Sequence, residues 1–310
     1  MALTSRLSFQ GPPSSDPEDF LASSLGVIFP DDVMCQHGDA AHALLYTSPH
    51  LPRPLRLALA DPDDERERAL FSHYLWNSSL LLAELIEAGT LKLDQPLSTG
   101  GGGQQGKANG DSDHGCDFDI ENLACLELGA GCALPSLMAA LLGASRVLVT
   151  DYPAPVILSN LRSNIAANTQ QPACTPVAPI AVEGHAWGAL DTPLAAAHRG
   201  GFDRVFVCDC LWMPWQHANL LASIAWFLRD GENGGRAWVV GGFHTGREKM
   251  RGFFAEAALR DAGLEIERIW ERDCDGVERE WAWDRGVEEV SERKRWQVIG
   301  VLRKVAGSKG

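Results

Sequence analysis

Residues 126–135, which read Leu126-Glu-Leu-Gly-Ala-Gly131-Cys-Ala-Leu-Pro135, decide the fold class of this chain. The stretch ends one apolar run and begins another with helical spacing, so it predicts a sharp turn from a strand into a helix. Gly129 and Gly131 let the backbone approach a ligand closely, and the helix that follows offers unpaired N–H groups and the positive end of its dipole. The turn is therefore predicted to bind a ligand.

Strand and helix patterns alternate from this turn to the end of the chain, which is typical of an α/β fold with a parallel sheet covered on both faces. The expected helices are residues 134–142, 155–168, 217–228 and 247–262. The expected strands are residues 123–128, 146–150, 177–182, 203–209, 236–242, 264–270 and 296–302.

The composition divides the chain into an N-terminal extension and one large domain. Residues 1–60 form the extension, and the run Gly11-Pro-Pro-Ser-Ser-Asp-Pro17 predicts that part of it is disordered. Residues 61–305 form the domain, which opens with an amphipathic helix that ends near Gly89. A flexible Gly-rich insertion is expected at residues 96–117, because such a composition cannot bury enough apolar surface to order itself.

The charge and cysteine content narrow the possible partners. The chain has 27 Lys and Arg against 41 Asp and Glu, a net charge of -14, which disfavours nucleic acid as a partner. The N-terminus lacks an apolar signal segment, and no apolar run is long enough to cross a membrane. None of the eight cysteines has the Cys-x-x-Cys spacing of a zinc or redox site, so no metal is expected and a reducing location, cytoplasmic or nuclear, fits best.

The kind of ligand follows from what the glycine turn lacks. A phosphate-binding loop would end in Gly-Lys-Ser or Gly-Lys-Thr, which the turn does not, so ATP and GTP are disfavoured. A dinucleotide loop would have a third glycine where Leu134 stands, which makes NAD the second choice. Glu127 can instead pair with the ammonium group of an amino-acid-bearing cofactor, although a solvated glutamate beside an unliganded turn remains the alternative.

Three further residues follow expected strands and would meet the turn at the same edge of the sheet. Asp151 can accept both ribose hydroxyls of an adenosine, unless it only caps the next helix. Trp187 can stack on the adenine, with ordinary packing as the alternative. Asp209 closes the apolar fourth strand and needs a polar partner there.

These motifs resemble those of the seven-β-strand S-adenosylmethionine-dependent methyltransferases, and specifically their lysine-methyltransferase-like group, which in fungi is also labelled nicotinamide N-methyltransferase-like. The resemblance covers residues 71–302 and rests on Glu127-Leu-Gly-Ala-Gly131, Thr150-Asp-Tyr-Pro153, Trp187-Gly188 and Asp209. It implies a Rossmann-like, doubly wound sheet of seven strands, mostly parallel with an antiparallel final strand. It also implies S-adenosyl-L-methionine as the cofactor.

The resemblance extends to individual residues. It implies that the cofactor is held by Trp76, Glu127, Gly129, Ala130, Gly131, Asp151, Tyr152, Trp187 and Cys208. The group usually has an acid followed at the third position by an aromatic residue after the fourth strand, and here Asp209 and Trp212 stand in those places. Both are candidate catalytic residues, although the sequence after Asp209 differs from that of members that modify elongation factor 1-alpha.

The expected reaction is methyl transfer to an amine, which requires alignment of the acceptor and exclusion of water but no nucleophilic triad. Asp209 can orient the amine or receive its proton, Trp212 can form an apolar wall, and His244 can serve as a second acid or base unless it is only structural. The expected acceptor is a protein lysine or an N-terminal amine, with elongation factor 1-alpha as one such protein. The alternatives are a nicotinamide-like small amine, an NAD-dependent oxidoreductase and an inactive cofactor-binding scaffold.

Overall fold

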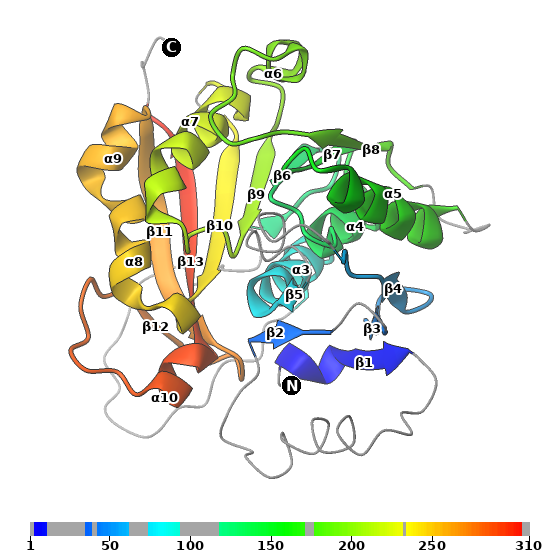
Figure 1. The fold of residues 1–310 in the computed structure, drawn as a ribbon, viewed down its shortest axis with the longest axis horizontal. Helices are drawn as coiled ribbons and strands as arrows, with labels where there is room; N and C mark the ends of the chain where they lie inside the picture. The colour runs from blue at the N-terminus through cyan, green and yellow to red at the C-terminus, as the bar shows by residue number, and fades with distance from the viewer. Residues whose placement is uncertain are drawn as a thin grey trace.

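The glycine turn joins strand β6 (Ala124–Leu128) to helix α4 (Leu134–Leu141) in the computed structural model of the chain (Figure 1). The structure describes residues 3–10, 35–38, 42–61, 74–93, 118–170, 177–231 and 234–305. The expected disorder at residues 11–17 and the expected insertion at residues 96–117 lie outside these ranges.

The central sheet confirms the predicted α/β class and has eight strands within the described residues, in the order β12-β11-β13-β10-β9-β6-β7-β8. Strands β10, β9, β6, β7 and β8 are parallel, whereas the final strand β13 runs antiparallel to both β10 and β11. The bounds are β7 Arg146–Asp151, β8 Ile180–Gly184, β9 Arg204–Cys208, β10 Arg236–Gly242, β11 Leu264–Asp273, β12 Glu278–Glu280 and β13 Trp296–Lys304.

The prediction of seven strands is one short, because β12 also pairs antiparallel with β11. All three of its residues are charged, so the apolar alternation that reveals a strand is absent from this segment. The strand expected at 177–182 begins three residues later, at Ile180.

Helices cover both faces of the sheet, as the alternating pattern predicts (Figure 1). One apolar core lies against α3 (Asn77–Thr90), α4 and α5 (Pro155–Thr169), and the other lies against α6 (Pro193–His198), α7 (His217–Phe227) and α9 (Glu256–Asp261). Strand β9 serves both cores, since Val205 and Val207 join the second while Phe206 and Cys208 join the first. Asp209 follows the last residue of the strand directly, so it lies at the carboxyl edge of the sheet.

The helix expected at residues 247–262 is broken into α8 (Arg247–Arg251), a 3-10 turn η5 (Gly252–Phe254) and α9. Gly252 lies at the break, where its low helix propensity weakens a continuous helix. The turn buries both Phe253 and Phe254 completely. The helix expected to open the domain and to end near Gly89 is present as α3, and it begins directly after strand β5 (Leu75–Trp76).

The N-terminal part forms strands that the sequence pattern did not predict. A 3-10 turn, η1 (Leu3–Arg6), leads into β1 (Leu7–Gln10), which pairs antiparallel with β3 (Ala43–Tyr46), and β3 pairs with β4 (Leu55–Leu57). A second, two-stranded sheet joins β2 (Gln36–His37) to β5. Asn164 on α5 holds the chain after β4 in place, because its side chain exchanges hydrogen bonds of 2.8 and 2.9 Å with the backbone of Ala58.

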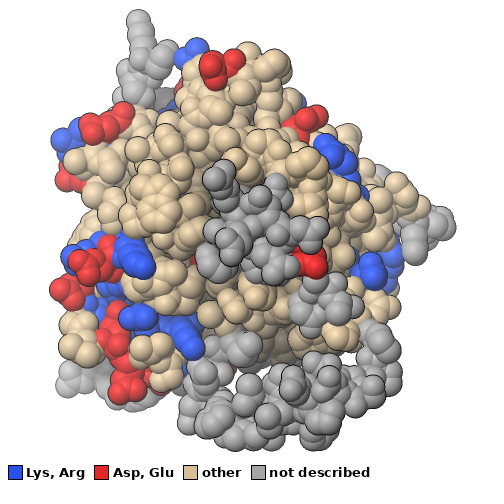
Figure 2. Space-filling view, viewed as in Figure 1, with Lys and Arg blue, Asp and Glu red and all other residues tan. Residues whose placement is uncertain are grey.

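The charged side chains are distributed without a single-sign patch on the face in Figure 2. Basic and acidic groups alternate over the region of α8 and the last short helix, α10 (Val290–Arg295). Within the described part of this face, nothing resembles the continuous basic stripe that tracks a nucleic-acid backbone.

Candidate functional site

A cavity opens at the carboxyl ends of β6, β7, β8 and β9, which is where open α/β sheets bind ligands. Its volume is about 940 Å³ including the open mouth. The loops after these strands line the cavity together with β5 and the first turn of α3. Ten of the predicted site residues line it: Trp76, Gly129, Ala130, Gly131, Asp151, Tyr152, Trp187, Cys208, Asp209 and Trp212.

The glycine turn forms one wall of the cavity through three left-handed residues. Gly129, Gly131 and Ala133 have φ values of 70°, 57° and 64°. A side chain at Gly129 would also collide, because its Cβ would lie 2.8 Å from Sγ of Cys210 and 3.1 Å from the ring of Trp187. At Gly131 the nearest described atom would be 4.0 Å from a Cβ, so the space above this residue is open to a ligand.

Asp151 is the last residue of β7, and its carboxylate holds the turn against that strand. Its Oδ2 accepts a hydrogen bond of 2.8 Å from the N–H of Gly131, and its Oδ1 accepts one of 2.7 Å from the N–H of Tyr152. Burial raises the pKa of Asp151, and the two backbone donors counteract this effect. Each carboxylate oxygen has a second lone pair, so the group can still accept hydroxyl donors from a ligand.

Glu127 is the predicted site residue that does not line the cavity. The side chain is fully buried, and Oε2 accepts hydrogen bonds from the backbone N–H and the hydroxyl of Ser136 in the first turn of α4. Its Oε1 has no hydrogen-bond partner among the described residues. Burial raises its pKa to about 8, so the carboxyl is mostly protonated at neutral pH and gives no full charge for an ammonium partner.

A second group of lining residues centres on Asp209, whose φ of 54° is left-handed. This conformation costs a residue with a Cβ about 1–2 kcal/mol, and strain of this kind is common at functional sites. Oδ2 accepts a hydrogen bond of 2.9 Å from the hydroxyl of Ser78, and Oδ1 lies 3.7 Å from Nε2 of His244. Burial raises the pKa of Asp209, whereas His244, Ser78 and the N–H of Gly242 lower it.

Two tryptophans line the same cavity as this carboxylate. Trp76 lines the cavity and stacks on the imidazole of His244, with ring centroids 4.7 Å apart at 20°. Trp212 lines it as well and meets Trp215 edge-on at 6.4 Å. A buried carboxylate among aromatic rings is an environment that favours a cationic group such as an amine.

The sequence reasoning missed several residues of the site. Ser78 contacts Asp209, and Ser79 lines the cavity, both from the start of α3. Their helix precedes the sheet by many residues, and no spacing signal reveals which strand it contacts. The other lining residues that were not assigned as site residues are Tyr74, Cys132, His185, Ala186, Cys210, Met213 and Gln216.

The sequence profile of a lysine methyltransferase family matches residues 64–257, which is more than half of the chain. The chain belongs to this lysine methyltransferase family. Membership confirms the predicted class of enzyme, a methyltransferase, and sets the oxidoreductase alternative aside.

Fungal relatives of this methyltransferase include the protein N-terminal and lysine N-methyltransferase of Gibberella zeae, which is 30% identical over 238 residues, or 72% of this chain and 75% of the relative. The protein of the same name from Yarrowia lipolytica is 28% identical over 232 residues, or 70% of this chain and 71% of the relative. Among solved structures, the arsenic(III) S-adenosylmethionine methyltransferase of Chlamydomonas reinhardtii is 18% identical, with a TM-score of 0.43 over 61% of this chain and 65% of that one.

The methyltransferase uses S-adenosylmethionine, and the cavity suits this cofactor. The open space above Gly131 gives room for a ligand beside the backbone, and the carboxylate of Asp151 borders that space. Trp187 supplies a flat apolar wall next to Gly129, and the unpartnered Oε1 of Glu127 lies just behind the turn as a further polar group.

The described residues contain no group of three or more His, Cys, Asp or Glu side chains that could hold a metal ion. In the same ranges, no helix is both long and apolar enough to span a membrane.

Proposed function

We propose that this methyltransferase transfers the methyl group of S-adenosylmethionine to an amine nitrogen of a protein, at a lysine side chain or at the amino terminus. The main support is the buried carboxylate of Asp209 at the aromatic end of the cavity, which suits a cationic amine. The names of the fungal relatives, which act on protein N-termini and lysines, point to the same class of acceptor.

The glycine-turn end of the cavity would hold the cofactor. In this proposal Asp151 accepts the ribose hydroxyls, Trp187 contacts the adenine, and the backbone of Gly129, Ala130 and Gly131 lies along the ligand. Three further lining residues, Trp76, Tyr152 and Cys208, complete the cofactor contacts. Glu127 would act from behind the turn, by holding the first turn of α4 through Ser136.

The acceptor end would align and deprotonate the amine. When bound, the cofactor supplies an electrophilic methyl group on a positively charged sulfur. An ammonium must lose a proton before its nitrogen can form the new C–N bond, and Asp209 can take up that proton because burial raises its pKa. Trp76 and Trp212, which line the cavity, would exclude water and orient the amine toward the methyl group that the bound cofactor would supply.

Elongation factor 1-alpha is the protein that we propose to test first as the acceptor. The full-length chain is incubated with a labelled methyl donor and either this factor or nicotinamide, and the label is counted in each. We expect transfer to the protein and at least about a 100-fold lower kcat for Asp209→Asn, with Asp191→Asn on the exposed surface unchanged as the control. Transfer to nicotinamide alone would overturn the protein acceptor, and transfer to neither by a chain that binds the cofactor would overturn elongation factor 1-alpha as the acceptor.

A further inference from the structure

His244 lies beside the cavity, but it belongs neither to the residues proposed to hold the cofactor nor to those proposed to contact the acceptor. Its imidazole lies between two residues that line the cavity, with the Trp76 ring stacked on one face and the carboxylate of Asp209 opposite Nε2. The side chain itself is 13% exposed and is not part of the cavity lining. It can therefore act on an acceptor only through its two neighbours.

The carboxylate of Asp209 has polar neighbours at both of its oxygens. The hydroxyl of Ser78 donates to Oδ2 over 2.9 Å, the N–H of Gly242 donates to the same carboxylate, and Nε2 of His244 lies 3.7 Å from Oδ1, which is beyond hydrogen-bond length. His244 is therefore the neighbour on the Oδ1 side, where it limits rotation of the carboxylate about its terminal torsion. Because positioning errors of about 1 Å can cost roughly 100-fold in rate, the orientation of this group matters for an acceptor that it binds.

The chain also leaves room for the imidazole at Gly242. This residue has φ and ψ of -81° and 143°, which any residue adopts, so the backbone does not require glycine. A Cβ there would lie 3.0 Å from Nδ1 of His244 and 3.6 Å from Oδ2 of Asp209. A side chain at this position would therefore crowd the imidazole, which would have to shift by a few tenths of an ångström.

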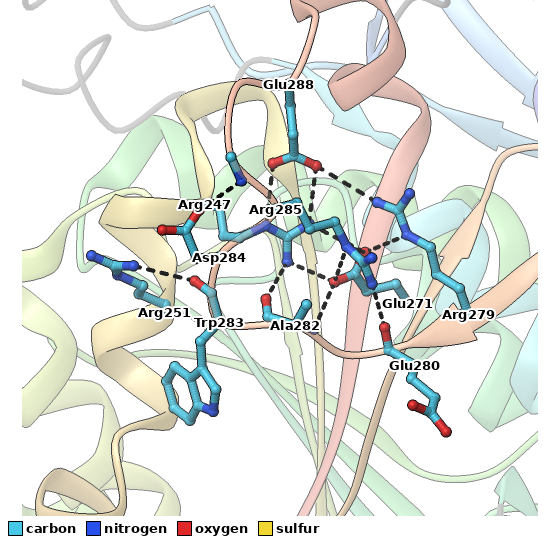
Figure 3. Close-up of polar contacts among 11 residues, drawn as sticks. Arg247, Arg251, Glu271, Arg279, Glu280, Ala282, Trp283, Asp284, Arg285 and Glu288 are labelled. Carbon is cyan, nitrogen blue, oxygen red and sulfur yellow. Dashed lines mark hydrogen bonds and ion pairs between the residues drawn. The ribbon is translucent and has the colours of Figure 1, made fainter.

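The backbone of His244 is anchored on both sides. The residue belongs to a 3-10 turn, η4 (Phe243–Thr245), whose Phe243 is fully buried and lies 4.0 Å below the guanidinium of Arg247. Arg247 is itself bound to Glu271, with Nη1 2.6 Å from Oε1, and to Glu288, with Nε 3.2 Å from Oε2 (Figure 3).

Figure 3 shows that this Arg247 site is part of a wider ion cluster. Arg279 and Arg285 also donate to Glu271. From the other side, Nη2 of Arg293 on α10 donates a hydrogen bond of 3.4 Å to the carbonyl of His244. The backbone of His244 is therefore fixed beside Asp209, and the stack on Trp76 sets the plane of its ring.

We propose that His244 is a positioning residue of the acceptor site, which fixes the carboxylate of Asp209, and the ring of Trp76 beside it, in the orientation that receives an amine. This inference rests on the proposed function, since it assigns the acceptor amine to Asp209. The proximity of Nε2 to Asp209, and not the stacking on Trp76, is what sets the affinity for the amine.

The test uses a probe that needs no identified substrate. Sinefungin is an analogue of S-adenosylhomocysteine that carries a primary amine on the carbon replacing the sulfur, so its amine occupies the region of the transferred methyl group. Calorimetry measures both ligands on the full chain, and the readout is the ratio of the two affinities. A residue that supports only the fold changes both affinities together, whereas a positioning residue for the amine changes the ratio.

Four variants separate the contributions. His244→Phe keeps an aromatic ring on Trp76 but lacks Nε2, and we expect the preference for sinefungin to fall about tenfold. His244→Gln restores an N–H donor without the ring, and its ratio should stay within about twofold of the native chain. Gly242→Ala should behave like His244→Phe, whereas Gly252→Ala, whose Cβ would meet no atom within 4 Å, serves as the matched control.

The outcomes distinguish this inference from the proposed function. If the native chain does not bind S-adenosylhomocysteine, both fail. If it does bind, and His244→Phe and Gly242→Ala keep the native ratio, the role of His244 alone is overturned. A loss of preference in His244→Gln equal to that in His244→Phe would also overturn it, because the polar contact would then not be the cause. Once a protein acceptor is in hand, the same variants should lower kcat more than they raise KM.

Discussion

Replacing Glu127 by glutamine should stabilise the protein at alkaline pH and leave it unchanged at acidic pH. Burial raises the pKa of this fully buried carboxyl from 4.5 to about 8, whereas the unfolded chain exposes it to water. Between these values the folded state binds one proton more than the unfolded state. The free energy of unfolding therefore falls as pH rises through this window, and it levels off above about 8.

The size of the effect follows from the shift. One pKa unit corresponds to about 1.4 kcal/mol, so the native chain should lose on the order of 4 kcal/mol from this group between pH 5 and pH 8. The glutamine side chain of the variant has no proton to lose, so the variant lacks this loss. All other titrating groups are common to both chains and cancel in the difference.

Urea denaturation of the native chain and Glu127→Gln at pH 5, 6.5 and 8 measures this difference directly. The stability of the variant relative to the native chain should increase steadily with pH. Glu121→Gln, at an exposed position, is the control and should show no such trend. If the difference between Glu127→Gln and the native chain is the same at pH 5 and pH 8, the carboxyl is not held protonated and the reasoning fails.

Three further experiments, two substitutions and one labelling reaction, test other parts of the structure. Gly129→Ala places a Cβ 3.1 Å from the Trp187 ring, at a residue whose backbone is left-handed. Calorimetry should therefore show at least about a tenfold loss of S-adenosylmethionine affinity, and unchanged affinity would refute the close approach. Glu271→Gln removes one of the two carboxylates that bind the buried Arg247, and because Glu288 remains we expect a loss of about 1.5–3 kcal/mol in chemical denaturation, against less than about 1 kcal/mol for Glu256→Gln in the exposed pair with Arg260. Burial raises the pKa of Cys132 to about 12, so iodoacetamide at pH 8 should leave this residue unmodified in peptide mapping; rapid alkylation would show that the thiol is accessible.

Part of the cavity lining was predictable because it follows from topology. Once residues 126–135 are assigned to a strand, a turn and a helix, the carboxyl ends of parallel strands must meet at one edge of the sheet, and this brings Asp151 and Asp209 to the glycine turn. The same argument applies to Trp187, which follows β8. The sequence order and the fold class were sufficient to predict these positions.

The remaining site contacts could not be predicted from the spacing of residues in the sequence. Ser78 and Trp76 reach Asp209 and His244 from a helix and strand that precede the sheet, so their approach is set by tertiary packing. Glu127 was expected to face a ligand, yet it lies under α4. A strand period of two explains this placement, since Leu126 and Leu128 both join the other core.

Calorimetric titration with S-adenosylmethionine and with NADH, on the native chain and on Asp151→Ala, shows whether the cavity binds the methyl donor. We expect the native chain to bind S-adenosylmethionine but not NADH, and Asp151→Ala to lose most of this affinity, because the carboxylate of Asp151 both borders the ligand space and holds the N–H of Gly131. Binding of NADH, or no binding of S-adenosylmethionine to a folded native chain, would contradict this expectation.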